Sequence, residues 1–315
     1  MDNIDLDLVR KQFLERSSIY KRLEEEAIFI IQQALNNTDI KIYSIQSRVK
    51  DVDSFLDKSR RKQCRNPIEE IKDIVGLRIV CLFLSDITRI SDIIRKSFDA
   101  IEEDNKIDSS EATLFGYLSM HFIVKLKDDC SGPRYQALKG LSFEIQIRTL
   151  TMDAWANVSH YLDYKSEVDI PGELKRDFYA LSGLFYVSDT HFEMFFKSRQ
   201  NVTQRLEESE LLPTQEINLD SLKIYLNKKF PEREHLSNPS DISELVDELI
   251  KNRYNSIGKL EDALAVSNDA FLAYEKENRG PNYYADLGAV RISLSIYDDN
   301  FRRGHGLTKS EKRAL

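Results

Sequence analysis

The segment GLRIVCLFL, Gly76 to Leu84, is almost continuously apolar and decides the fold class of this chain. A short apolar run of this kind predicts a strand buried on both faces, because a half-exposed strand would alternate apolar and polar residues. Two further segments, 120–126 and 142–148, do alternate, which predicts strands with one side toward solvent. Another strand is expected over 40–49.

Helical patterns surround these strands. Apolar residues recur at spacings of three and four over 5–36, which predicts one long helix that ends at Asn36. Asp51 is a suitable N-cap for a short helix to about Lys62. Further helices are expected at 86–98, 150–162 and 172–200, and a polar loop at 101–115. Strands mixed with helices predict an α/β (α+β) domain.

The composition changes near 211–218, where Pro213 interrupts the pattern. We place a domain boundary there, so that residues 1–210 form the α/β domain and residues 211–315 an all-α extension. Short helices are expected in the extension at 219–230, 239–252, 256–278 and 282–298, followed by a basic tail from Arg302. No motif in the extension points to chemistry; autoregulation, homo-oligomerisation and docking of a partner protein are its candidate roles.

Composition narrows the class of protein. The 315 residues are 41% hydrophobic and 31% charged, as in soluble globular proteins. No apolar run approaches the roughly 20 residues that cross a bilayer, and the acidic N-terminus lacks a signal pattern, so we expect a cytoplasmic protein without a membrane partner. The net charge of −8 argues against a general nucleic-acid coat protein. Three widely spaced cysteines indicate neither a disulfide framework nor a zinc site.

A first polar cluster is cationic. Arg48 and Lys50 lie two residues apart on a predicted strand and therefore point to one side. Ser54 and Lys58 share one stripe of the following helix with Lys62. Such a concentration of cations suits a polyphosphate, although a solvated helix face would show the same pattern.

A second cluster places Asp73 just before the buried strand, with Gly76 allowing a tight start. A carboxylate in this position can be presented to Mg²⁺. The alternative is a turn residue paired with Arg78.

The third cluster is Gly116-Tyr-Leu-Ser-Met-His121. Tyr117 and Ser119, delivered by a loop before His121, suit base stacking and polar contacts to a sugar or phosphate. A strand that begins at glycine with a packed tyrosine explains the same residues.

The fourth cluster lies on the strand at 142–148, where apolar Phe143, Ile145 and Ile147 alternate with polar residues. This alternation is typical of any strand with one solvated side. The polar side carries Glu144, Gln146 and Arg148, and the next helix offers Asp153, Asn157 and His160 on one face beside Trp155, an expected core anchor.

The order of these clusters is more specific than any one of them. The succession R-x-K, S-x-x-x-K, D-x-x-G-x-R, G-Y-x-S-x-H, E-x-Q-I-R-T, A-W-A-x-x-x-H and Y-K (Tyr164-Lys165) resembles the synthetase domain of the RelA/SpoT family over about residues 20–200. Members of that family have a nucleotidyltransferase-like mixed sheet flanked by helices, which agrees with the predicted elements.

The resemblance implies an enzyme of the small, synthetase-only type, a magnesium-dependent GTP pyrophosphokinase. Such an enzyme transfers pyrophosphate from ATP to the 3′-hydroxyl of GDP or GTP and releases AMP, making the (p)ppGpp alarmone of the stringent response. The implied donor-binding residues are Arg48, Lys50, Ser54, Lys58 and Arg78. Asp73 and Glu144 would be catalytic and hold Mg²⁺, Glu144 also taking the proton of the attacking hydroxyl. The implied acceptor-binding residues are Tyr117, Ser119, His121, Gln146, Arg148, His160 and Lys165.

Two departures from the family pattern affect the acceptor. Leu118 stands where guanosine-alarmone synthetases usually have arginine, and Ser159 stands where a glutamate often precedes the helix histidine. An alternative acceptor is therefore the 3′ end of tRNA or an adenosine nucleotide, as for toxic relatives. The first helix carries basic residues that could contact tRNA: Arg10, Lys11, Arg16, Lys21 and Arg22.

The residues argue against two other functions. A catalytically weak nucleotide-sensing module is a second alternative, against which the presence of both Asp73 and Glu144 argues. Hydrolysis is not expected, because none of the five histidines is followed by the aspartate of the family's hydrolase motif.

Overall fold

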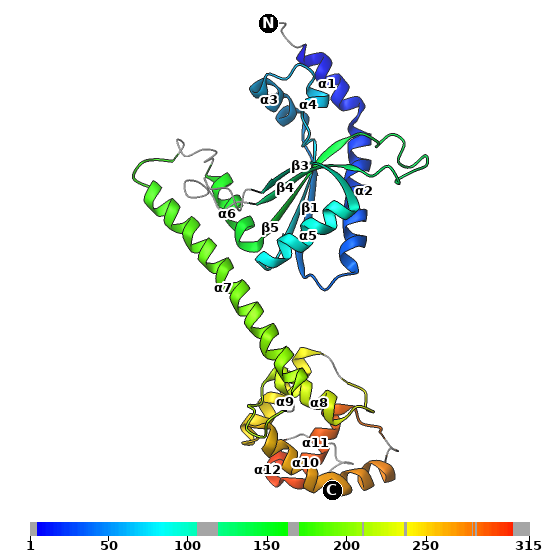
Figure 1. Cartoon of the computed structure of the whole chain (residues 1–315), viewed down its shortest axis with the longest axis vertical. Coiled ribbons are helices and arrows are strands. Elements are labelled where there is room, and N and C mark those ends of the chain that lie inside the picture. The colour runs from blue at the N-terminus through cyan, green and yellow to red at the C-terminus, as the bar shows by residue number, and fades with distance from the viewer. Residues whose placement is uncertain are drawn as a thin grey trace. The chain divides into compact units, whose positions relative to one another are not determined.

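The computed structural model describes residues 5–105, 119–162, 170–209, 211–235, 238–278, 280 and 282–304. The chain divides into two compact units, Met1–Phe196 and Lys197–Leu315 (Figure 1). The first contains a five-stranded mixed sheet flanked by helices, and the described part of the second is helical apart from one isolated bridge. This confirms the predicted nucleotidyltransferase-like α/β fold with an all-α C-terminal extension.

The sheet has the strand order β1-β2-β5-β4-β3. Only β2 and β5 are parallel, and every other neighbouring pair is antiparallel. The apolar segment that begins at Gly76 forms β2, an interior strand between β1 and β5, and the strand ends at Cys81. The prediction that it is buried on both faces is wrong in part, because Gly76 and Arg78 are only half-buried. The strands span Ile42–Val49 (β1), Val75–Cys81 (β2), Phe98–Asn105 (β3), Met120–Leu126 (β4) and Ser142–Thr149 (β5).

Two helices, α2 and α5, pack against each other and against one face of the sheet (Figure 1). Apolar side chains of α2, α5 and the facing strand positions form the main core of this unit, and many, such as Leu23, Ile90 and Ile145, are fully buried. The opposite sheet face is left for polar residues. The helices of the first unit span Leu6–Glu15 (α1), Ser17–Asn36 (α2), Val52–Lys62 (α3), Pro67–Glu70 (α4), Leu84–Ser97 (α5), Leu150–Tyr161 (α6) and Lys175–Glu208 (α7), the last of which continues into the second unit.

The prediction of one helix over 5–36 is wrong, because the chain breaks into α1 and α2 at Arg16. The Arg16 N–H donates back to the carbonyls of the preceding turn, which ends α1. The Phe13 ring lies 4.7 Å from Phe55 of α3 and 5.4 Å from Tyr20. We attribute the break to this packing, since helical periodicity alone does not show that α1 packs against α3.

The expected loop at 101–115 is also wrong in part, because residues 101–105 belong to β3. Beyond Phe98 this strand is exposed and rich in acids, and it pairs only with β4 at the edge of the sheet. Charged edge strands of this kind resist pairing with other chains, and their composition resembles that of a loop. The rest of that segment lies outside the described residues.

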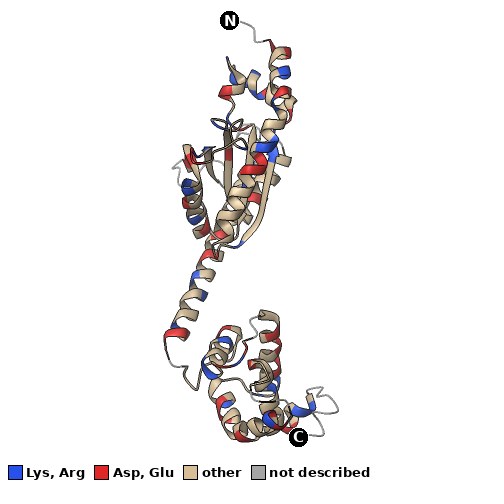
Figure 2. Cartoon of the chain, turned by 90° about the vertical axis from the view of Figure 1, so that its right-hand side faces the viewer, with Lys and Arg blue, Asp and Glu red and all other residues tan. Residues whose placement is uncertain are grey.

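The second unit builds its own core from the buried faces of its helices, with Leu222, Leu245, Leu260 and Leu294 fully buried. Acidic and basic residues are interspersed along the helices of both units (Figure 2). Among the described residues, no helix is long and apolar enough to cross a membrane. The helices of this unit span Leu219–Lys229 (α8), Pro239–Lys251 (α9), Ile257–Asn278 (α10), Asp286–Tyr297 (α11) and Asp299–Gly304 (α12).

Candidate active site

The polar face of the sheet aligns the predicted site residues in two rows. Because side chains alternate along strands, residues paired across neighbouring strands share a face. The strand register sets Arg48 beside Gly76 and Gly76 beside Glu144. A second row runs from Gln46 through Arg78 and Gln146 to His121. Four separate clusters of the sequence thereby meet on one surface.

A cavity of about 150 Å³ opens on this face. Gly76 lines it between Arg48 and Glu144, and a side chain there would point into open space, since no heavy atom of the described residues lies within 4 Å of where its Cβ would be. The missing side chain keeps the space between Arg48 and Glu144 open. The cavity is lined by Gln46, Ser47, Arg48, Gly76, Leu77, Arg78, Glu144 and Gln146.

Asp73 joins the cationic cluster to β2. Its Oδ2 atom accepts from Lys50 Nζ at 2.8 Å and from Lys58 Nζ at 2.5 Å. Burial raises the pKa of this carboxyl, but the hydrogen bonds from the two lysines outweigh burial and leave the pKa below its ordinary value. The alternative pairing of Asp73 with Arg78 is wrong, because Arg78 pairs elsewhere. The Asp73 Oδ1 atom is buried without a hydrogen-bond partner within the part of the chain that the structure describes.

Glu144 is held by two neighbours on the same face. His121 Nδ1 donates to Glu144 Oε1 at 2.9 Å, and Gln146 Nε2 donates to Oε2 at 2.9 Å. A carboxylate only accepts, so His121 carries its proton on Nδ1, and its Nε2 lies 2.6 Å from Ser119 Oγ. Burial raises the pKa of Glu144, but the hydrogen bond and charge of His121 lower the pKa below its ordinary value. Glu144 is therefore ionised at neutral pH.

Two arginines share one acid from α6. Asp153 Oδ1 lies 3.0 Å from Arg78 Nη1 and 3.5 Å from Arg148 Nη1. Asn157, one turn later, donates to Asp153 Oδ2 at 3.0 Å. Burial and the charge of Arg78 lower the pKa of Arg148 to about 10, against the opposing effect of Asp153. Asp153 thus fixes both guanidinium groups beside the cavity.

The residues fit a magnesium ion in part. No group of three or more His, Cys, Asp or Glu side chains suited to a metal gathers within the described residues. Mg²⁺ commonly takes only one or two protein carboxylates and completes its shell with water and substrate phosphates. Glu144 lines the cavity, and the Asp73 Oδ1 atom has no hydrogen-bond partner among the described residues. These are the two carboxylates that would hold the ion.

Two of the predicted residues, Ser54 and His160, do not line the cavity. Ser54 is exposed at the start of α3, where its N–H donates to Asp51 Oδ1. His160 is exposed near the end of α6. Tyr117 and Lys165 lie outside the described residues, as do Leu118 and Tyr164. The proposed roles of these residues remain predictions.

Two features of the site are not predicted by any sequence motif. Gln46 lines the cavity although no motif includes it; its position two residues before Arg48 on the same strand is the available signal. The sequence pattern places Asp153 on a helix face but does not predict its pairing with Arg78, which joins two elements far apart in the sequence.

Comparisons with known proteins agree with these motifs. Residues 47–169 match the family described as "Region found in RelA / SpoT proteins". The chain is 37% identical to the GTP pyrophosphokinase YjbM and 34% identical to the GTP pyrophosphokinase YwaC, both of Bacillus subtilis (strain 168), over 135 residues each. These matches cover 42% and 41% of this chain and 61% of the length of each relative. The crystal structure of small alarmone synthetase 1 from Bacillus subtilis is 30% identical, with 62% of this chain and 99% of that chain covered and a TM-score of 0.49.

Proposed function

We propose that this chain, which belongs to the RelA/SpoT family, transfers a pyrophosphoryl group from ATP to the 3′-hydroxyl of GDP or GTP. The single observation that carries the proposal is the setting of Glu144, an ionised carboxylate in the wall of a cavity that Arg48 and Arg78 also line. The two curated relatives are named GTP pyrophosphokinases, and the chain spans 61% of their length.

The donor half of the site is a set of fixed cations. Arg48 and Arg78 line the cavity, and Asp73 holds the ammonium groups of Lys50 and Lys58 together beside it. Transfer of a charged phosphoryl group depends mainly on positioning and on neutralising charge, with little covalent help from the protein. In this proposal the four cations bind the triphosphate of ATP, and Arg78 stacks on the adenine.

In the proposed transfer step, Glu144 accepts the proton that the acceptor hydroxyl releases. The acceptor 3′-oxygen forms a bond to the β-phosphorus of ATP, the bond between that phosphorus and the oxygen bridging to the α-phosphorus breaks, and AMP leaves. Glu144 accepts the hydroxyl proton, and the hydrogen bonds from His121 and Gln146 keep its carboxylate in place. A positioned base of this type commonly contributes about 10²–10⁴-fold to rate.

A divalent ion belongs to this proposal. Asp73 and Glu144 would hold Mg²⁺, with Asp73 contributing the Oδ1 atom that lacks a protein partner. The bound ion would neutralise charge that develops on the phosphates. On the acceptor side, Gln146 and Arg148 follow Glu144 on the same strand face and would contact the acceptor nucleotide.

The proposed reaction is tested by measuring which acceptor receives the label of γ-labelled ATP. The protein is incubated with ATP, Mg²⁺ and either GDP, GTP, an adenosine nucleotide or bulk tRNA, and each acceptor is separated and counted. We expect label on GDP or GTP together with release of AMP. Label on tRNA or on the adenosine nucleotide would overturn the proposed acceptor, but it would support pyrophosphoryl transfer from ATP. Absence of label from every acceptor would overturn the proposed reaction and favour a nucleotide-sensing module.

The base is tested with Glu144→Gln, which keeps the shape of the side chain and removes its charge. We expect the rate of transfer to fall by about 10²–10⁴-fold while ATP still binds, since the donor cations are unchanged. Glu102→Gln, at an exposed position on β3, is the matched control and should leave the rate unchanged. An unaltered rate in Glu144→Gln would remove Glu144 from the role of base.

A further inference from the structure

Two acidic side chains of helix α7, Asp189 and Glu193, are buried in the first unit. Asp189 is 2% exposed and Glu193 is 8% exposed, and they lie on one helical stripe with the buried Phe178. Leu184 and Phe195, away from this stripe, are 60% and 74% exposed. Buried carboxylates are costly unless they are hydrogen-bonded or protonated. Their contacts therefore indicate what the acids do.

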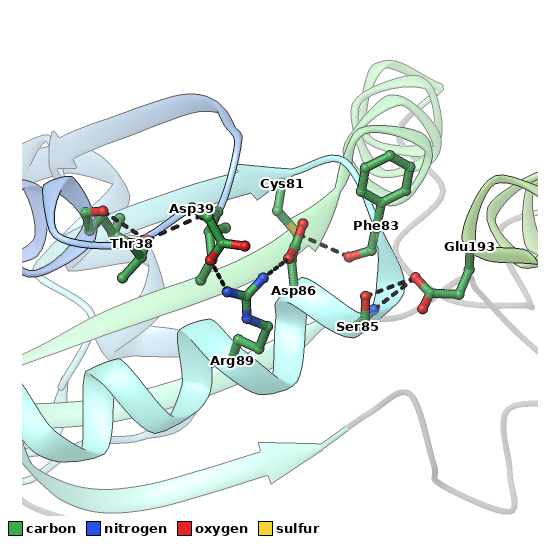
Figure 3. A network of polar contacts seen from close by, with 10 residues as sticks. Thr38, Asp39, Cys81, Phe83, Ser85, Asp86, Arg89 and Glu193 are labelled. Carbon is green, nitrogen blue, oxygen red and sulfur yellow. Dashed lines mark hydrogen bonds and ion pairs between the residues drawn. The ribbon is translucent and has the colours of Figure 1, made fainter. Parts of the chain in front are cut away.

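Each acid contacts the N-terminus of another helix. The Thr149 hydroxyl donates to Asp189 Oδ2 at 2.5 Å, and Thr149 is the N-cap of α6, accepting from Met152 N at 3.1 Å. Glu193 Oε2 accepts from Ser85 N at 3.0 Å and from Ser85 Oγ at 3.1 Å (Figure 3). Ser85 is in the first turn of α5, whose N-cap Phe83 provides no capping side chain. Helix α7 thus anchors the starts of both α5 and α6.

The charges around Asp189 are mainly negative. On α7 it faces Glu193; on β2 it faces the buried Cys81 thiol, whose pKa is raised to about 12 chiefly by burial. On α5, the charge of Glu193 helps to raise the pKa of Asp86, although burial is the larger cause. The nearby cation Arg89 forms ion pairs with Asp86, at 3.2 Å, and with Asp39 (Figure 3).

Burial, and then the charge of Glu193, raise the pKa of Asp189 to about 7. Its protonation therefore changes in the physiological range of pH.

The contact between Asp189 and Thr149 lies close in the sequence to residues of the candidate active site. Thr149 directly follows Arg148, and Asp153 lies in the first turn of the helix that Thr149 caps. We propose that Asp189 is a positioning residue: in its protonated form it fixes α7 on the start of α6, and so holds Asp153 against Arg78 and Arg148. A proton on one helix thereby controls the geometry of two arginines on the sheet.

The sign of the effect follows from linkage. The docked helix favours the protonated acid, because its pKa there is raised above the ordinary value of about 4. Docking is therefore strongest below about pH 4 and weakens as pH rises through about 7. Alkaline conditions should loosen α7 from α6, and acidic conditions should tighten it.

Trp155, the only tryptophan, reports on this contact. It lies on α6 and is 3% exposed, with its ring 4.5 Å from Phe178 and 5.9 Å from Phe185 of α7. Loosening of α7 should expose the indole and shift its emission to longer wavelength. We expect a transition with a midpoint near pH 7 when the full chain is titrated between about pH 5.5 and about pH 8.5.

Two substitutions test the origin of the transition. Asp189→Asn mimics the protonated acid, so the emission should stay at its acid value over the whole range. Glu193→Gln removes the neighbouring charge and should move the midpoint to lower pH. His191→Gln, which removes an exposed histidine from the same helix, is the control and should keep the wild-type curve. A wild-type transition in Asp189→Asn, or the loss of the transition in His191→Gln, would overturn the proposal.

A second measurement follows the site and rests on the proposed function. Above pH 7 the KM for ATP should rise several-fold in the wild type relative to Asp189→Asn, with kcat changed less, and the two should agree at pH 6. Equal KM values at every pH would overturn the link to the arginines. The fluorescence titration needs no catalysis, so a failure of the proposed reaction leaves it intact and the two failures can be told apart.

Discussion

Asp73 in the first unit is partly buried and Glu275 in the second is buried, and both are acids paired with cations, yet they differ in how completely they are paired. Glu275 is 1% exposed, and each of its oxygens accepts two hydrogen bonds. Oε1 accepts from Arg233 at 2.7 Å and from Tyr284 N at 3.0 Å, and Oε2 accepts from Arg233 at 2.8 Å and from Asn282 N at 3.2 Å. The Arg233 guanidinium also contacts the Phe271 ring.

Asp73 accepts hydrogen bonds from both lysines on one oxygen, and its other oxygen has no partner among the residues that the structure describes. The same incomplete pairing recurs further along the polar face of the sheet, since Gln146 Oε1 and Arg148 Nε are also buried without a hydrogen-bond partner among the described residues. Unpaired buried polar atoms cost stability, so a group of them on one face of a sheet indicates a site built for a ligand. The saturated pair of the helical unit indicates a structural role.

The largest effect is expected from breaking the saturated pair. Glu275→Gln leaves Arg233 buried without a counter-charge, which should cost about 3–5 kcal/mol of unfolding free energy. Urea denaturation followed by circular dichroism measures this cost. Glu244→Gln, at an exposed partner of Arg291, is the control and should cost about 0–1 kcal/mol. If Glu275→Gln were as stable as this control, the structural interpretation would be wrong.

The second effect is on catalysis. Asp73→Asn removes the charge that organises Lys50 and Lys58 and one proposed ligand of Mg²⁺. The rate of transfer should fall by about 10²–10³-fold, while the unfolding free energy should change by only about 1 kcal/mol. Labelled transfer and urea denaturation of the same preparation give both values. A large loss of stability with an unchanged rate would make Asp73 a structural acid like Glu275.

Local patterns predicted much of the fold. The apolar run at β2 and the alternation of β4 and β5 identified the strands. A strand with one buried face alternates apolar and polar residues, and a mostly buried strand is nearly continuously apolar. The break at Arg16 and the strand at 101–105 were not predicted. The first depends on the packing of Phe13 against α3, and the second on pairing with β4, and neither is a local property.

The candidate site was predicted unevenly for a related reason. Arg48, Arg78, Glu144 and Gln146 lie on strands, where alternation fixes which side they face, and all four line the cavity. Partners between distant elements could not be inferred from spacing. The pairing of Asp73 with both lysines, of Asp153 with two arginines, and of Asp189 with Thr149 all depend on how the elements pack.

A third prediction compares glycines of the two units. A Cβ at Gly258 would lie 2.8 Å from both Pro213 Cβ and Pro213 O, whereas one at Gly76 would meet nothing within 4 Å. Gly258→Ala should therefore destabilise the helical unit by about 1–3 kcal/mol, the usual cost of overpacking. Gly288→Ala on α11, where the nearest atom is 3.5 Å away, is the control and should be neutral or stabilising by up to about 1 kcal/mol. Thermal denaturation compares them, and equal melting temperatures would contradict the close approach.

The smallest effect concerns the hydrogen bonds on Glu144. His121→Ala removes the Nδ1–H donor whose hydrogen bond lowers the pKa of Glu144. The base works only when ionised, so activity is present above this pKa and is lost as pH falls through it. Removing the donor raises the pKa and should move the acid limb of kcat/KM to higher pH, by about one unit or less.

The acid limb is measured with GDP as acceptor at several pH values. Ser119→Ala is the matched control, because it leaves the hydrogen bond from His121 to Glu144 in place and should keep the acid limb of the wild type while changing acceptor affinity. An acid limb in His121→Ala that coincides with the wild-type limb would show that His121 does not act on the base. The incompletely paired region would then resemble the saturated one more closely, since its hydrogen bonds would serve packing and not chemistry.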